Sequence, residues 1–134
     1  LAACAGEAIV FKRPYPGAIA YAGLAGVAAG EALRYSAVTA LGDRWNTRII
    51  VTPGEAPITR GPYHLMRHPN YAAIAIEMVA LPMIRGCWIT AGLFSAGNAA
   101  LMAIRIPAEE RALGASYARA FARLPRLIPA RRIR

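Results

Sequence analysis

Long apolar runs separated by short polar segments dominate the pattern along this sequence. A helix of roughly 20 apolar residues can cross a bilayer, and shorter helices can do so where they tilt or where protein lines them. We therefore predict one all-α domain over residues 1–134, a multi-span integral membrane helical bundle with a helical hairpin and a C-terminal amphipathic helix. The predicted spans cover residues 1–11, 17–41, 71–84 and 87–104, and the predicted surface helix covers 107–124. Because residue 1 is a leucine within an apolar run, we expect a further segment to precede it.

The two later spans are expected to form the hairpin. Arg85-Gly86 interrupts the apolar pattern between them, and a glycine at this position favours a turn. At a rise of about 1.5 Å per residue, folding the chain here places Glu77 and Asn98 at a similar depth, so we expect a hydrogen bond between them. In the preceding span, Glu31 and Arg34 are three residues apart, and we expect them to form an ion pair. The alternative for both pairs is a role along the path of a substrate, because ionisable groups in membrane spans are often functional.

The segment 43–70 between the second and third spans is polar and contains no long periodic run. We expect it to form a structured loop over the membrane surface. Within it, the short apolar stretches 49–51 and 58–59 flank the proline- and glycine-containing stretch 52–57. This arrangement predicts a short β-like excursion.

The segment 107–124 has the pattern of a basic amphipathic helix. Pro107 followed closely by Glu109 and Glu110 is typical of a helix N-terminus. Apolar side chains then recur at helical spacing, at Leu113, Tyr117, Phe121 and Leu124. Basic side chains fall on the opposite side, at Arg111, Arg119 and Arg123. A helix of this kind suits the surface of an anionic membrane.

The distribution of charge along the chain predicts an orientation of the protein in the membrane. The formal net charge is +9, and every basic residue except Lys12 is an arginine. Charge alone would suit a nucleic-acid-binding protein, but long uncharged runs in a chain that is 57% hydrophobic favour a membrane protein, so we expect no nucleic-acid partner. Arginines concentrate in 42–70 and 105–134, and the positive-inside rule places both in the cytoplasm, with Lys12 and Arg85 opposite. We expect an integral protein of a bacterial inner membrane with its site facing the cytoplasm.

Several kinds of site are disfavoured by the residues themselves. Cys4 and Cys87 lie far apart in apolar surroundings, and we interpret them as packing residues, not as a disulfide or half of a metal site. His64 and His68 are four residues apart, but a residue that precedes a proline, here Pro69, is pushed out of helical geometry. The two histidines then do not share a helix face, and we predict no metal site. The serines have no evident base partner, and no glycine-rich phosphate loop is present.

Two polar clusters flank the predicted hairpin. The first, in 61–71, contains His64 and an Arg67-His68 pair, and the second, in 105–111, contains a Glu109-Glu110 pair. Folding the hairpin returns the second cluster to the level of the first, so both are expected at one mouth. This juxtaposition defines the candidate site.

These side chains offer complementary chemistry to one kind of ligand. Arginine and histidine suit a carboxylate or phosphate, and glutamates suit amine or hydroxyl donors. Tyr63, Tyr71 and Tyr117 offer aromatic faces to a flat or cationic group. S-adenosylmethionine (SAM) carries a group for each of these partners. Nicotinamide cofactors and lipid head groups carry partners for only some of these side chains.

The clusters also carry a family resemblance. Gly61-Pro62-Tyr63 with Arg67-His68-Pro69-Asn70-Tyr71, followed by Arg105-Ile106 with Glu109-Glu110-Arg111-Ala112-Leu113, resembles the isoprenylcysteine carboxyl methyltransferase family, within a wider group of membrane phospholipid methyltransferases. The resemblance covers roughly residues 40 to 130. It implies a multi-span helical enzyme that binds SAM at the cytosolic membrane face and takes a lipophilic acceptor from the bilayer.

The resemblance assigns roles residue by residue. It implies that the cofactor is bound by Arg67, His68, Pro69, Tyr71, Glu109 and Glu110. The candidate catalytic residues are Arg105, Glu110 and His64. Arg105 is expected to neutralise the acceptor or hold the acidic pair, and His64 or a glutamate is the candidate base for a phenol or amine acceptor.

The acceptor is left open between an isoprenylcysteine-type carboxylate and an alkylated phenol. Members of the family often continue after the leucine with Phe-Gly-x-x-Tyr-x-x-Tyr, and Leu113-Gly114-Ala115-Ser116-Tyr117 retains only part of that pattern. Two other functions also stay open at this point. One is a membrane NADPH-dependent sterol-type reductase, since such enzymes carry an Arg-His-Pro-x-Tyr motif, and the other is a non-catalytic membrane subunit.

Overall fold

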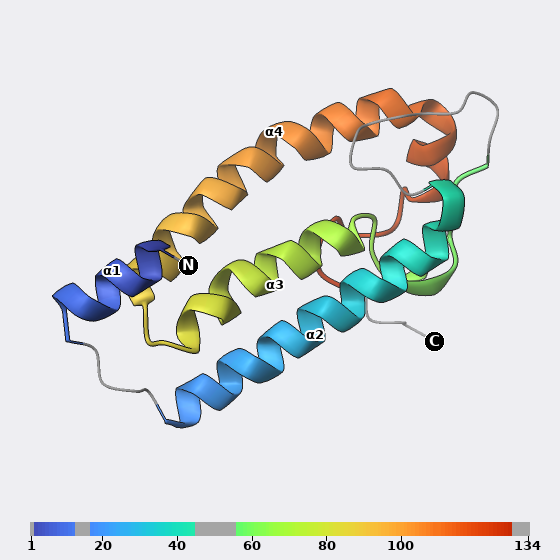
Figure 1. Ribbon diagram of the computed structural model, residues 1–134. Helices are drawn as coiled ribbons and strands as arrows, with labels where there is room; N and C mark the ends of the chain where they lie inside the picture. The colour runs from blue at the N-terminus through green and yellow to red at the C-terminus, as the bar shows by residue number, and fades with distance from the viewer. Residues whose placement is uncertain (1, 13–16, 45–55, 130–134) are drawn as a thin grey trace.

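The computed structural model describes residues 2–12, 17–44 and 56–129, and within them every regular element is a helix (Figure 1). The α-helices are α1 (Ala2–Val10), α2 (Ala18–Leu41), α3 (Pro69–Met83) and α4 (Trp88–Ala120), with 3₁₀ turns η1 (Gly42–Arg44) and η2 (Gly61–His64). This confirms the predicted all-α class. Of the predicted β-like excursion, residues 56–59 form no strand, and residues 49–55 lie outside the described residues.

Helices α2 and α3 pack closely because glycines on α2 face α3. A Cβ atom placed on Gly26 would lie 2.8 Å from the Cβ of Ala80, and one on Gly30 would lie 2.8 Å from the Cγ of Glu77. Small residues allow helix backbones to approach in this way. Figure 1 shows α3 between α2 and α4, so α3 forms the centre of a three-helix layer.

The hairpin bend lies where the sequence predicts it. Helix α3 ends at Met83 and α4 begins at Trp88, with Gly86 between them at a φ of 67°. A positive φ of this size is readily adopted by glycine and strained for other residues. The bend returns α4 along α3.

The expected pairing of Glu77 with Asn98 across the hairpin is wrong. Glu77 instead forms an ion pair with Arg34 of α2, while the amide of Asn98 faces Met102 on its own helix, 3.8 Å from the sulfur. The close approach of α2 at Gly30 explains the difference, because it brings a cation against the buried side of Glu77. The expected contact of Arg34 with Glu31 is present, at 3.9 Å.

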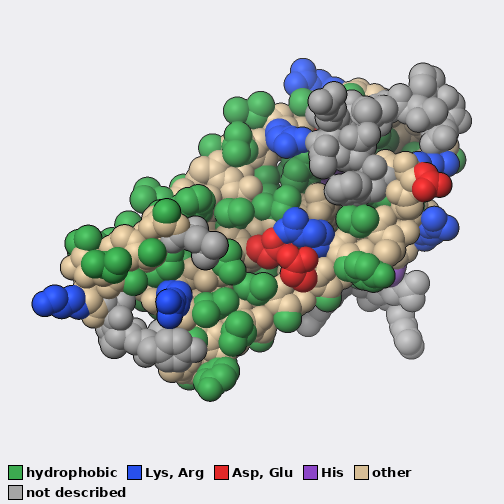
Figure 2. Space-filling model, in the orientation of Figure 1, with side chains coloured by type: hydrophobic (Ala, Val, Ile, Leu, Met, Phe, Trp, Pro, Cys, Tyr) green, Lys and Arg blue, Asp and Glu red, His purple; other side chains and the backbone are tan. Residues whose placement is uncertain are grey.

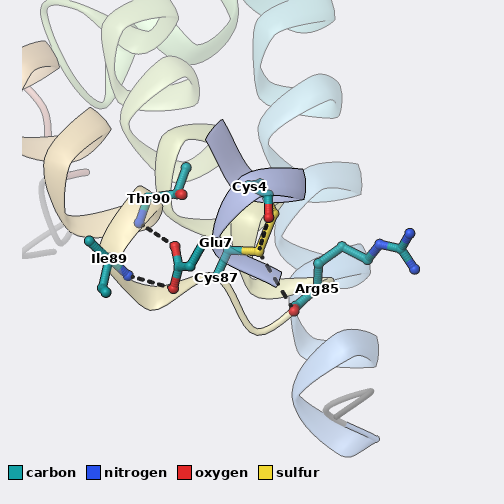
Figure 3. Close-up of a disulfide and its surroundings, with 6 residues drawn as sticks. All are labelled: Cys4, Glu7, Arg85, Cys87, Ile89 and Thr90. Atoms are coloured by element: carbon teal, nitrogen blue, oxygen red, sulfur yellow. Dashed lines mark hydrogen bonds between the residues drawn. A yellow bond between two sulfur atoms is a disulfide. The ribbon is translucent and has the colours of Figure 1, made fainter. Parts of the chain in front are cut away.

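The interpretation of the cysteines as unpaired packing residues is also wrong. Cys4 of α1 and Cys87, just before α4, form a disulfide with their Cα atoms 5.6 Å apart (Figure 3). Beside it, the buried carboxylate of Glu7 accepts hydrogen bonds from the backbone N–H groups of Ile89 and Thr90, at 3.1 and 2.7 Å. The first N–H groups of a helix lack intrahelical partners and favour an anion, so Glu7 caps α4. A covalent bond and a cap therefore fasten α1 to the hairpin turn.

The predicted break between a span ending at 104 and a surface helix starting at 107 is a third correction. Helix α4 runs through Pro107 to Ala120, and its geometry breaks only at Gly114, with φ 74° and ψ −166°. A proline removes one helical hydrogen bond and can be accommodated within a long helix, whereas glycine permits the positive φ of a sharp kink. The basic amphipathic stretch is thus the kinked end of α4.

Apolar side chains also cover much of the outside of the molecule. Leu93, Leu101 and Ile104 of α4 are each at least 60% exposed, and Figure 2 shows hydrophobic side chains across much of the visible face. Within the described residues, α4 is the one helix that is both long and apolar enough to cross a membrane.

Candidate active site

The two polar clusters of the sequence meet in space. The carboxylate of Glu110, on α4, lies 3.4 Å from Nη1 of Arg67 and 3.2 Å from Nε2 of His68, which precede α3. More than forty residues separate Glu110 from either partner, so the hairpin bend creates the contact. The predicted convergence at one mouth of the hairpin is confirmed.

Local sequence rules fix the orientation of His68. It is the N-cap of α3, with φ −128° and ψ 65°, and Pro69 occupies the first helical position. A proline suits that position and forces the preceding residue out of helical geometry. His68 is therefore turned away from the helix axis into the site, where it is only 4% exposed.

A fourth residue, Arg126, completes the cluster and was not predicted from the sequence. Its guanidinium binds Glu110 with two hydrogen bonds, of 2.7 and 3.1 Å. Hydrogen bonds between charged partners with this forked geometry are among the stronger ones in proteins. Glu110, Arg67, His68 and Arg126 together are called the Glu110 cluster below.

Arg126 belongs to the C-terminal segment, residues 121–129, which lies across the start of α3. The backbone N–H groups of Arg67 and His68 each donate to this segment at 2.9 Å, to the carbonyls of Pro125 and Arg126. The guanidinium of Arg67 also donates to the carbonyl of Leu124 at 2.6 Å. Both the main chain and the side chain of Arg67 are therefore held by the C-terminal segment.

Aromatic rings line the other side of His68. The ring centroids of Tyr71 and Tyr117 lie 5.7 and 6.2 Å from that of the imidazole. The hydroxyl of Tyr117 donates to the carbonyl of Arg67 at 3.2 Å, and its ring packs on Phe121 with centroids 4.5 Å apart. Tyr117 and Phe121 belong to a buried apolar core that also contains Tyr63.

Tyr71 links the Glu110 cluster to the remaining predicted residues. Its hydroxyl lies near the side chains of Glu109 and Arg105. The two acids of the sequence motif thus have different partners, because Glu109 interacts with Tyr71 whereas Glu110 binds the basic groups. Seven of the predicted site residues are accordingly brought together: Arg67, His68, Pro69, Tyr71, Arg105, Glu109 and Glu110.

The charged surroundings control the protonation of the site, which lies beyond the apolar part of α4. Partial burial acts to raise the pKa of Glu110, but hydrogen bonds from Arg126 and His68 outweigh burial and lower that pKa below its ordinary value. Burial, aided by the nearby charge of Glu109, raises the pKa of Tyr63 well above its ordinary value. Burial does the same to the pKa of Tyr117. The cluster therefore presents an ionised carboxylate beside neutral phenols.

His64 is the predicted residue that does not join the cluster. It lies in η2, is exposed, and interacts through Nδ1 with the carbonyl of Gly61. His64 is one of the residues that line a separate cavity of about 470 Å³, together with Arg119 and Arg123. In the described residues, no group of three His, Cys, Asp or Glu side chains is arranged to hold a metal ion.

With this geometry in place, comparison with known proteins is informative. The profile of the isoprenylcysteine carboxyl methyltransferase (ICMT) family matches residues 22–115, more than half of the chain. The chain belongs to the ICMT family. Membership identifies the protein as methyltransferase-like and membrane-associated. The matched range contains the motif residues of the site, whereas the C-terminal segment with Arg126 lies beyond it.

A curated relative is also similar to this chain. A Bacillus subtilis (strain 168) protein named "Uncharacterized protein YpbQ" is 43% identical to this ICMT-family chain over 83 residues. The aligned part is 62% of this chain and 49% of YpbQ, so the chain spans about half the length of that relative. The similarity supports the family assignment.

Proposed function

We propose that this protein transfers a methyl group from SAM to an oxygen atom of a lipophilic acceptor at the cytoplasmic face of a membrane. The observation that carries the proposal is the meeting of Glu110 with Arg67 and His68 at the mouth of an apolar hairpin, in a chain of the ICMT family. The acceptor class is an isoprenylcysteine-type carboxylate or an alkylated phenol.

The donor set of the site fits SAM. The carboxylate of Glu110 suits the ammonium group of the cofactor, and the guanidinium groups of Arg67 and Arg126 suit its carboxylate. The faces of Tyr71 and Tyr117 suit a sulfonium by cation–π attraction. When bound, SAM supplies an electrophilic methyl group.

The protein contributes mainly by positioning the cofactor and the acceptor and by neutralising the charge of the acceptor. Holding two reactants in a reactive geometry can lower a barrier by about 7–11 kcal/mol in the best cases. Arg105, beside Tyr71, is placed to neutralise an acceptor carboxylate, which needs no base. For a phenol, Glu109 is better placed than His64 to accept the hydroxyl proton, because Glu109 interacts with Tyr71 whereas His64 faces a separate cavity.

The membrane arrangement belongs to the same proposal. Exposed apolar side chains on α4 suit lipid. As further predicted spans, α3 packs against α4 and α2 packs against the other side of α3. The arginines gather near the Glu110 cluster, whereas the disulfide lies at the hairpin turn, the opposite end of α4. Disulfides persist in oxidising compartments, and arginines concentrate on the cytoplasmic side of a membrane. Their positions at opposite ends of α4 therefore favour a cytoplasmic site and an extracytoplasmic turn.

A methyl-transfer assay in detergent tests the proposal. The purified protein is incubated with SAM carrying a labelled methyl group and a panel of prenyl-cysteine and alkyl-phenol acceptors. Label in an organic-extractable product, lost in Glu110→Gln, is expected. In parallel, a thermal shift with SAM, S-adenosylhomocysteine or NADPH reports the cofactor. Stabilisation by NADPH alone, or by none of the three, would overturn the proposal.

A further inference from the structure

A cavity lies beside the Glu110 cluster, and the methyl-transfer proposal makes no use of it. Its volume is about 470 Å³, within the range of small-ligand sites. Thr59, Tyr63 and His64 line one side, and Arg119, Arg123 and Leu124 line the other. The cavity is therefore built between the η2 region and the end of α4.

The charge of this cavity is uncompensated. Arg119 and Arg123 are exposed, and no acidic residue is part of the lining. Within the described parts of the chain, neither guanidinium has an acidic partner at ion-pair distance. Of the two nearby acids, Glu110 is paired with the basic groups around it, and Glu109 lies near Tyr71. Arg119, near the end of α4, and Arg123, just beyond it, thus present their donors without an internal anion.

We propose that this cavity binds a phosphate group, carried by an anionic lipid headgroup or present as free phosphate. Arginine presents planar, paired N–H donors that match phosphate oxygens, and the hydroxyl of Thr59 adds a further donor at the rim. The cavity lies at the polar end of α4, beyond its apolar part, where a headgroup would meet the protein. This inference does not depend on the methyl-transfer proposal.

A bound phosphate would contact the chain that holds the candidate site. Ala122 and Leu124 contribute to the cavity, and their carbonyls accept hydrogen bonds from the guanidinium of Arg67. The same short stretch therefore faces the phosphate on one side and Arg67 on the other. Occupation of the cavity is expected to stabilise the C-terminal segment.

Thermal unfolding of the full chain in an uncharged maltoside detergent tests the proposal. The probes are phosphatidylglycerol in mixed micelles and sodium phosphate, the latter compared with sodium chloride at equal ionic strength. A rise in Tm with either probe is expected, and the arm that gives the rise identifies the source as lipid or free phosphate. The double variant Arg119→Gln/Arg123→Gln is expected to bind the active probe roughly tenfold or more weakly, because it loses two charged donors.

A charge-matched control distinguishes binding of phosphate at this cavity from a general effect of the net charge. Lys12→Gln/Arg85→Gln removes the same two charges at the opposite end of the molecule and is expected to keep the full response. The proposal is overturned if neither probe raises the Tm of the native protein. It is equally overturned if both double variants respond alike.

Discussion

Replacing Glu110 by glutamine tests the centre of the candidate site. The carboxylate holds Arg67, His68 and Arg126, and its side chain is only 16% exposed. Glutamine keeps the shape but removes the charge. A hydrogen bond to a charged group contributes about 1.5–3 kcal/mol, so loss of the bond to the cofactor ammonium predicts roughly 10- to 100-fold weaker binding of S-adenosylhomocysteine. Isothermal titration calorimetry in detergent measures this Kd, and the labelled-methyl assay measures turnover.

A matched substitution separates a role in the site from a general effect of charge. Glu31→Gln makes the same chemical change on α2, where the side chain is 63% exposed and lies outside the cluster. This variant is expected to bind and turn over as the native protein does. If Glu110→Gln kept native affinity and full turnover, the assignment of Glu110 to the cofactor would be refuted.

Three further predictions concern stability. Gly30→Leu is expected to destabilise the protein by about 1–3 kcal/mol in chemical unfolding, because its Cβ would lie 2.8 Å from Glu77, whereas Gly97→Leu, with nothing within 4 Å, should be neutral. Cys87→Ser should cost about 2–4 kcal/mol and abolish the effect of dithiothreitol on Tm; a native Tm that ignores dithiothreitol would contradict the disulfide. Because the folded-state pKa of Glu110 is lowered, its stabilising contribution is present above the ordinary value of 4.5 and is lost as pH falls below it. The Tm difference between the native protein and Glu110→Gln should therefore shrink in acid, and a constant difference would contradict the ion pairs.

Much of the fold follows from the sequence because it depends on short-range rules. The range 17–41 predicts α2 to within one residue at its start, and 71–84 predicts α3 to within two. The bend at Arg85-Gly86 follows from an interruption of the apolar pattern. Once these elements are placed, helix geometry alone requires the ends of the hairpin to meet, which is why the contact of Glu110 with Arg67 and His68 could be predicted.

The incorrect expectations share a different cause. The predicted pairing of Glu77 with Asn98 compared the depths of residues on α3 and α4 only. The observed partner of Glu77 is Arg34, which lies on α2. The pairing of Cys4 with Cys87 depends on where α1 docks, and no periodicity within α1 specifies that. Both contacts depend on packing between elements, which local patterns do not determine.

The part played by Arg126 shows why one element of the site was beyond sequence reasoning. Arg126 stands among other arginines in the sequence. Binding of these arginines to a membrane surface would explain them without any tertiary contact. What places Arg126 at Glu110 is backbone pairing, since the N–H groups of Arg67 and His68 donate to carbonyls of the C-terminal segment. Backbone pairing leaves no side-chain pattern, although the prolines at 125 and 129 keep this segment out of a helix and so leave its carbonyls free. The arginines near the C-terminus thus lie in two separate places: Arg126 completes the Glu110 cluster, whereas Arg119 and Arg123 line an adjacent cavity with no acid in its lining.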